Sequence, residues 1–188
     1  KRMLKCDAAP ITYRSEGLAK ALGLENLYIT FNGYFPERGA KMMTCSFKET
    51  EAYSVCARTD ENCDKILVVA SAGNTARAFA KVCSDNNIPL LLSVPEDNLN
   101  ALWFTEPLND CVKLISCRKG GDYFDAIHLS NLALKSDMFY AEGGAKNIAR
   151  RDGMATTVLS AATTIGQIPD YYFQAVGSGT GAIAAWEA

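Results

Sequence analysis

The 188-residue sequence predicts an α/β fold built on a mostly parallel sheet. Short runs of apolar and β-branched residues, typical of buried strands, alternate with longer stretches in which apolar residues recur every three or four positions, typical of helices. Glycine-rich turns follow two of the short runs. The composition is 48% hydrophobic and 21% charged, as expected of a folded protein with a core.

Six short runs are predicted to be strands. They span 26–31 (NLYITF), 65–71 (KILVVAS), 89–95 (PLLLSVP), 112–117 (VKLISC), 138–142 (MFYAE) and 171–177 (YYFQAVG). Five stretches with helical periodicity lie between them, near 15–23, 48–58, 75–86, 123–135 and 153–166. This alternation indicates βαβ units.

The chain is predicted to form two lobes. The four strands between Lys65 and Glu142, with their helices, can form a small αβα lobe over residues 46–146. Residues 1–45 and 147–188 would then form a larger cofactor-binding lobe. We expect this lobe to be incomplete, that is, C-terminally truncated, because the sequence stops at a strand, a glycine loop and the start of a helix. No flexible linker rich in Pro, Gly or Ser separates the lobes.

Charge and hydropathy exclude several partners. The chain carries 19 basic and 21 acidic side chains, with no basic stripe for nucleic acid. Its longest apolar runs are far too short to span a bilayer, and no leader opens the chain, so a cytoplasmic location without membrane contact is expected. A small-molecule partner is favoured.

Cysteine and histidine exclude other kinds of site. Seven cysteines, an odd number with no C-x-x-C pair, indicate free thiols in a reducing compartment. The single histidine, His128, has no acidic or cysteine cluster beside it in the sequence, which argues against a metal site and against a Ser-His-Asp triad.

The segment VGSGTGAIAAW, residues 176–186, predicts a phosphate site. Backbone amides of a glycine-rich turn and a helix N-terminus suit a phosphate group. The residues are Gly177, Ser178, Gly179, Thr180 and Gly181. The alternative is a turn that needs only tight backbone packing. The segment lacks the P-loop lysine and the dinucleotide spacing, so a phosphate other than that of ATP or NAD is favoured.

A second polar loop, ASAGNTARAFA at residues 70–80, also joins a strand to a helix. Ser71, Asn74 and Thr75 could donate to an anion there. The alternative is an ordinary helix N-cap.

Lys48 in the segment TCSFKE is the third feature. It could be a solvated lysine in the first helical turn. Beside a phosphate loop and an anion loop, however, a lysine amine is what a pyridoxal phosphate enzyme needs for the cofactor's aldehyde.

These motifs resemble those of the pyridoxal phosphate enzymes of the tryptophan synthase β-like fold, fold type II, and among them the threonine synthase group. TCSFKE resembles the family pattern T-G-S-F-K-D, which makes Lys48 the lysine that bonds the cofactor. SAGNT resembles S-S-G-N-T, which implies that Asn74 contacts the cofactor's phenolic oxygen and that Ser71 and Thr75 hold the substrate carboxylate. VGSGTG stands where the family binds the cofactor phosphate.

A fourth segment, NIARRDGMAT at 147–156, is similar to the threonine synthase pattern N-x-x-R-x-E-G-x-x-T. It implies that Arg150 contacts substrate or the other lobe. The alternative is an ion pair with Asp152 or Glu142.

Departures from the threonine synthase pattern indicate which group of these enzymes the chain resembles. Glu49, Thr50 and Glu51 replace the D-R-G that usually follows the lysine, and Met42-Met43 replace Asn-Pro. With GYFPERGA and AVGSGTG..AWEA, the chain resembles cysteate synthases. The resemblance implies β-replacement, in which O-phospho-L-serine and sulfite give L-cysteate and phosphate on the way to coenzyme M, and a homo-oligomer. The alternatives are a threonine synthase acting on O-phosphohomoserine, a dehydratase, or a non-catalytic fragment.

Two anionic reactants call for cations near the cofactor. Lys41, Arg77 and Arg150 lie in or near the motifs, although solvated positions are the usual fate of such residues. Cys45 is expected to be a small packing residue where relatives carry glycine.

Overall fold

The computed structural model describes residues 1–188 and contains a central four-stranded sheet. Its strands are β5 (Ile66–Ala70), β6 (Leu90–Pro95), β7 (Val112–Cys117) and β8 (Phe139–Ala141), in the spatial order β7-β6-β5-β8. All neighbouring pairs are parallel. The predicted α/β class with a parallel sheet is therefore confirmed.

Helices cover both faces of this sheet. α4 (Tyr123–Ala133) packs on one face, where the Ser93 hydroxyl donates to the Ala126 carbonyl at 2.7 Å. α3 (Asn74–Asp85) packs on the other face and shares a core with the fully buried Leu92. Side chains of a strand alternate between faces, so the neighbours Leu92 and Ser93 point to opposite helices.

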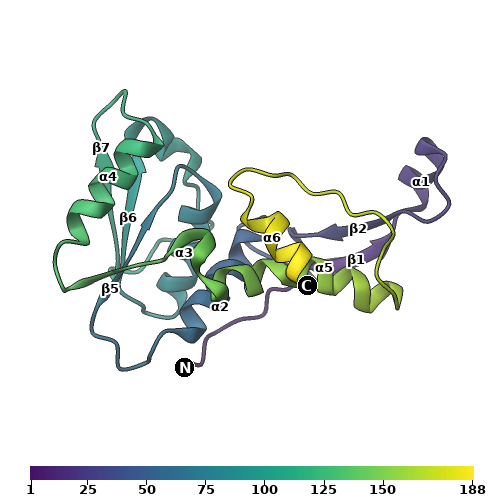
Figure 1. Ribbon diagram of the computed structural model, residues 1–188, viewed down its shortest axis with the longest axis horizontal. Helices are drawn as coiled ribbons and strands as arrows, with labels where there is room; N and C mark the ends of the chain where they lie inside the picture. The colour runs from purple at the N-terminus through teal and green to yellow at the C-terminus, as the bar shows by residue number, and fades with distance from the viewer.

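The other elements lie beside this unit. They are β1 (Ile11–Arg14), α1 (Glu16–Leu22), β2 (Tyr28–Phe31), β3 (Tyr34–Phe35), β4 (Ala40–Lys41), α2 (Lys48–Arg58), α5 (Ile148–Ile165) and α6 (Thr180–Glu187), with short 3-10 turns at Pro36–Arg38, Glu96–Ala101 and Gly144–Lys146. In Figure 1 the four-stranded sheet lies on the left, the paired strands β1 and β2 and the helix α5 extend to the right, and α2 and α5 meet between them. We propose that these two sides correspond to the expected small and large lobes.

The crossing of α2 and α5 requires a glycine. A Cβ on Gly153 of α5 would lie 2.8 Å from the Glu51 Cα and closer still to the Thr50 carbonyl oxygen. Real Cβ atoms do not approach backbone so closely, so the two helices can touch here only because Gly153 has no side chain. This contact brings the start of α5 against the first turn of α2.

Two expectations about elements were wrong, and three short strands were not predicted. No strand forms at 171–177, because no neighbouring strand supplies the hydrogen-bond ladder that a strand needs, and Phe173 is 91% exposed. The strands that were not predicted are β1, which pairs antiparallel with β2, and β3 and β4, which pair antiparallel with each other. α5 begins at Ile148 rather than near 153, because the Asn147 side chain caps it by accepting a hydrogen bond from the Ala149 amide at 2.9 Å.

No helix combines the length and the apolar character needed to cross a bilayer.

Candidate active site

Lys48 is the first residue of α2, and its amine is largely enclosed. The side chain is 18% exposed, Nζ lies 4.9 Å from the centre of the Phe47 ring, and Glu51 Oε2 is 3.2 Å from Nζ. Burial lowers the Lys48 pKa, and the positive charge of Arg150 adds to this effect, while Glu51 and Glu142 oppose it. Lys48 is therefore not the freely solvated lysine of the alternative interpretation.

Glu51, Arg150 and Glu142 extend this contact into a buried charge cluster. Arg150 Nε lies 2.7 Å from Glu51 Oε1, and Arg150 Nη1 donates to Glu142 Oε2 at 2.9 Å. The side chains are 0% exposed for Glu51, 8% for Glu142 and 11% for Arg150. With Lys48, the cluster holds two cations and two acids.

The buried position changes the proton affinity of Glu51. Desolvation raises the Glu51 pKa from 4.5 to about 7, against the opposing pull of Arg150 and Lys48. At neutral pH an exposed glutamate is almost fully ionised, whereas burial brings the Glu51 pKa close to neutrality.

Arg150 forms one of the two ion pairs considered from the sequence. It pairs with Glu142, whereas Asp152 pairs with Arg58. Its guanidinium is thus held between Glu51 and Glu142. A contact between Arg150 and substrate stays a prediction.

The turn before Lys48 is closed by Glu49. The fully buried Glu49 carboxylate accepts a hydrogen bond from the Thr44 amide at 2.8 Å, and the Ser46 hydroxyl accepts one from the Lys48 amide at 3.3 Å. Cys45 has a φ of 52°, a conformation that favours glycine. The expectation that Cys45 packs inside was wrong, because its side chain is exposed.

The segment Ser71–Thr75 joins the carboxyl end of β5 to α3, whose first two residues are Asn74 and Thr75. Ser71 is buried and its hydroxyl accepts from the Gly73 amide at 3.2 Å. No side chain caps α3, so the capping alternative does not hold. Asn74 is exposed, and its Oδ1 accepts from Arg77 Nη1 at 3.3 Å. The two donors of its amide NH₂ group are not used in this contact.

Arg77 is buried rather than solvated. It is 5% exposed, stacks 3.5 Å above the Trp103 ring and donates from Nε to the Trp103 carbonyl at 3.3 Å. Its Nη2 forms no hydrogen bond within the chain. Burial lowers the Arg77 pKa. Lys41, by contrast, is exposed on β4.

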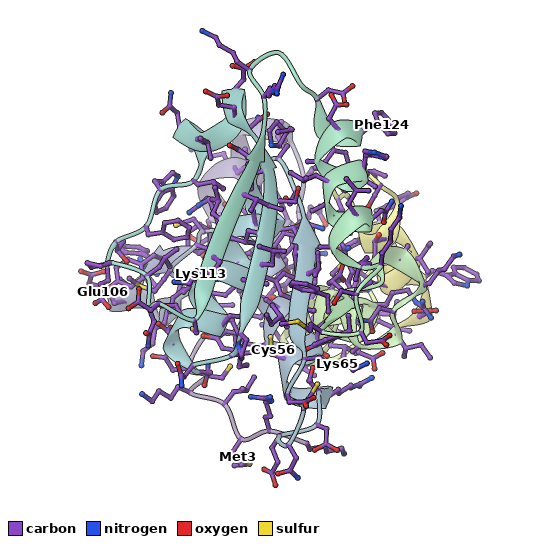
Figure 2. The ribbon with its side chains drawn as sticks, turned by 90° about the vertical axis from the view of Figure 1, so that its left-hand side faces the viewer. Met3, Cys56, Lys65, Glu106, Lys113 and Phe124 are labelled. Carbon is purple, nitrogen blue, oxygen red and sulfur yellow. The ribbon has the colours of Figure 1, made fainter.

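A cavity of about 280 Å³ adjoins Arg77, on the opposite side of the sheet from α4. Figure 2 shows this separation, with Glu106 of the cavity wall on one side of the sheet and Phe124 of α4 on the other. Three acids, Asp7, Asp85 and Glu106, line the cavity with Arg77 and Lys81, and Lys81 pairs with Asp85. This lining does not favour an anion, so we assign the cavity no role in the site.

The glycine loop reaches the start of α6. Gly179 has a φ of 82° and precedes Thr180, which is 1% exposed and whose hydroxyl lies 2.9 Å from that of Ser178. A Cβ on Gly177 or Gly179 would meet nothing within 4 Å, whereas one on Gly181 would lie 2.6 Å from the Gln174 amide nitrogen. The loop thus presents the exposed Ser178 hydroxyl and the free amides of α6 beside open space, with the buried Thr180 hydroxyl next to that of Ser178.

Phe47 links this loop to Lys48. Ala184, one turn into α6, is fully buried against Met154 and Ala155 of α5, and Phe47 packs on the same cluster. The start of α2 and the start of α6 are therefore held beside the same stretch of α5.

These groups fit pyridoxal phosphate. The α6 amides with Ser178 and Thr180 suit its phosphate, the Asn74 amide suits its phenolic oxygen, and the enclosed Lys48 amine suits its aldehyde. The predicted cofactor and substrate residues lie on three turns and the helix starts that follow them, whereas Arg150 lies in the first turn of α5, which packs on α2 and α6. Sequence reasoning missed Glu51; an acid three residues after Lys48, where the threonine synthase pattern has glycine, was the available signal.

Comparison with known proteins defines the class. The family model described as "Pyridoxal-phosphate dependent enzyme" matches residues 10–188. The chain therefore belongs to the pyridoxal-phosphate dependent enzymes, and pyridoxal phosphate is the cofactor of this family.

Within this family the chain is cysteate synthase-like. It is 54% identical over 185 residues to the cysteate synthase of Methanosarcina barkeri and 56% identical over 180 residues to that of Methanocella arvoryzae. The matches cover 98% and 95% of this chain but 44% and 43% of those proteins. The chain thus spans less than half the length of these curated relatives.

Solved structures show the fold. Cysteine synthase from Entamoeba histolytica matches with a TM-score of 0.73 at 13% identity, and O-acetyl serine sulfhydrylase isoform 3 from the same organism with 0.74 at 12%. Each match covers 100% of this chain and 57% of the other. The predicted fold type II is confirmed.

Proposed function

We propose that the full-length protein containing these residues catalyses β-replacement, converting O-phospho-L-serine and sulfite to L-cysteate and phosphate, a step toward coenzyme M. The observation that carries the proposal is the 51–56% identity to cysteate synthases over 95–98% of the chain. The Glu49-Thr50-Glu51 sequence after Lys48 also separates this chain from the threonine synthase pattern.

Lys48 is proposed to act at the substrate's α-carbon. Pyridoxal phosphate, when bound, supplies an electron-withdrawing ring that stabilises the negative charge left when the α-proton departs. The Lys48 amine takes this proton, for which it must be uncharged. Its lowered pKa, caused mainly by burial, supports this role.

Polar groups from the other two turns position the reactants. We propose that Ser71 and Thr75 hold the substrate carboxylate and that Gly177, Ser178, Gly179, Thr180 and Gly181 hold the cofactor phosphate. The exposed Asn74 amide is proposed to contact the cofactor's phenolic oxygen, with Arg77 holding its orientation through Oδ1. Arg150 stays a candidate substrate contact, although its acids already balance its charge.

A substrate panel tests the reaction. The full-length protein is incubated with pyridoxal phosphate and O-phospho-L-serine, with and without sulfite, and separately with O-phosphohomoserine. Cysteate formed only with sulfite supports the proposal. Threonine from O-phosphohomoserine would assign the chain to the threonine synthase branch, and a keto acid formed without sulfite would indicate a dehydratase.

We also propose that the full-length protein is located in the cytoplasm and forms a homo-oligomer. Large apolar side chains that are more than four-fifths exposed, at Ile168, Tyr171, Phe173 and Trp186, support contact of this region with further protein. Light scattering of the full-length protein measures the oligomeric state.

A further inference from the structure

Glu51 is the acid nearest to the Lys48 amine in a site from which water is largely excluded. It lies one helical turn after Lys48, and its Oε2 is 3.2 Å from Nζ. Neither Glu51 oxygen accepts a hydrogen bond of good geometry from elsewhere in the protein, and no part of its side chain is exposed. Oε2 is therefore free to take a proton.

The proposed role of Lys48 creates a need for such an acceptor. An ordinary lysine, with a pKa of about 10.4, is charged at neutral pH and can neither attack an aldehyde nor remove a proton. If its proton left for bulk water, the cluster of Lys48, Glu51, Arg150 and Glu142 would change from neutral to a net negative charge in a buried place, which is costly.

We propose that Glu51 receives the proton of Lys48 and holds it while the lysine amine acts. The Nζ–H bond breaks, its electron pair stays on nitrogen, and an O–H bond forms on Glu51 Oε2. Two opposite charges disappear together, so the cluster is neutral before and after. This inference rests on the proposed function, in which Lys48 carries the cofactor.

The remaining pair stays in place during this transfer. Arg150 keeps its hydrogen bond to Glu142, and the second Glu142 contact, from the Gly144 amide to Oε2 at 3.0 Å, is independent of Lys48. These two donors meet Oε2 of Glu142, whereas Glu51 is the acid whose carboxylate lies 3.2 Å from the Lys48 amine.

The charged groups around Glu51 are few. Lys48 faces it from α2, Arg150 from α5 and Glu142 from the turn after β8. Two other charged residues of α5 point elsewhere, because Arg151 pairs with Glu187 and Asp152 with Arg58. On α3, Arg77 faces Asn74 and Trp103. Burial lowers the pKa of Lys48 and raises that of Glu51, which brings the two proton affinities closer.

The first test measures the coupling without cofactor. Full-length protein is treated with an amine-acetylating reagent across a pH series, and the modified fraction of the Lys48 peptide is read by mass spectrometry. We expect Glu51→Gln to lower the midpoint for Lys48 by about 1–3 pH units, because an opposite charge is removed. Asp152→Asn, which breaks an exposed pair, should leave it unchanged. An unchanged midpoint in Glu51→Gln overturns the proposal.

The second test detects the transferred proton. The infrared difference spectrum between protein with and without pyridoxal phosphate should gain the C=O band of a protonated carboxylic acid. This band should be absent in Glu51→Gln and shifted in frequency in Glu51→Asp. If Glu51→Gln does not fold, the Glu51→Asp shift alone decides. A missing band, or one that neither variant alters, overturns the proposal.

Borohydride reduction distinguishes a failure of the proposed role of Glu51 from a failure of the proposed function of Lys48. After reduction of the cofactor-loaded protein, a pyridoxyl group should be found on the Lys48 peptide. If it is there but no acid band appears, only the role of Glu51 fails. If it is on another lysine, the proposed function fails, and with it the transfer from Lys48.

Discussion

Gly153 of α5 lies directly against the backbone of Glu51 in α2, where a Cβ would come within 2.8 Å of the Glu51 Cα. The contact places Arg150, one turn earlier on α5, beside Glu51 and Lys48. A backbone contact without any side chain therefore determines the geometry of the charge cluster.

Replacement of Gly153 by alanine should destabilise the protein. Neither backbone can yield without separating α2 from α5, so we expect a loss of about 1–3 kcal/mol in the free energy of unfolding, measured by urea denaturation. Gly17→Ala in α1 is the matched control, because a Cβ there meets nothing within 4 Å. It should be neutral or stabilising by up to about 1 kcal/mol. Equal stability of the two variants would contradict the close crossing.

The raised pKa of Glu51 predicts a pH dependence of folding. The folded state holds this proton more tightly than the unfolded chain, so the resulting stabilisation is complete below pH 4.5 and is lost as the pH rises through about 7. Relative to Glu51→Gln, the wild type should lose about 3 kcal/mol over this window. Denaturant unfolding of both proteins across the pH series measures this difference.

Glu187→Gln is the control for that experiment, because Glu187 is 43% exposed and pairs with Arg151 at the surface. Its stability should follow the wild type at every pH. Parallel curves for wild type and Glu51→Gln would show that Glu51 titrates normally.

Thr180 should contribute to cofactor affinity. Its buried hydroxyl lies at the N-terminus of α6, beside that of Ser178. A hydrogen bond to a charged phosphate contributes about 1.5–3 kcal/mol, so Thr180→Val should weaken pyridoxal phosphate binding about 10- to 100-fold in an absorbance titration. Thr163→Val, which removes an exposed hydroxyl bonded to its own helix, should bind normally. Unchanged affinity in Thr180→Val would remove Thr180 from the phosphate site.

Arg77 should act on the cofactor through Asn74. Because Arg77 fixes Oδ1 of Asn74, losing either side chain should disturb the same contact. In a double-mutant cycle with Arg77→Gln and Asn74→Ala, we expect the effects on cofactor affinity to be non-additive by about 0.5–3 kcal/mol. The control cycle combines Arg58→Gln with Asn74→Ala. Their effects on cofactor affinity should be additive, since Arg58 pairs with Asp152 at the surface. Additive effects for Arg77 would mean that it does not orient Asn74.

Local sequence patterns predicted the features that depend only on neighbouring residues in the chain, namely the apolar strands and the turn motifs. The apolar runs that became β5 to β8 carry their own burial signal, and the turns around Lys48, Asn74 and Thr180 carry a motif. The run at 171–177 has the same local signal, but a strand also needs a partner, and the pattern of one segment cannot report on another.

The charge cluster could not be predicted from the sequence for a related reason. Glu51 and Glu142 are separated by 91 positions, and only the packing of α2 and α5 next to β8 brings both acids to Arg150. From the sequence, each resembles an ordinary surface acid. In the sequence Glu142 is a candidate partner of Arg150 because it lies close in the chain, whereas Glu51 stands out only as a departure from a motif.

Cysteate formation by a lysine variant tests the central claim most directly. Full-length wild type, Lys48→Ala and Lys41→Ala are each given pyridoxal phosphate, O-phospho-L-serine and sulfite, and L-cysteate is quantified. We expect cysteate from the wild type and from Lys41→Ala, whose lysine is exposed on β4, and none from Lys48→Ala. Undiminished cysteate from Lys48→Ala, or none from the wild type, would contradict the assignment of Lys48 and of the reaction.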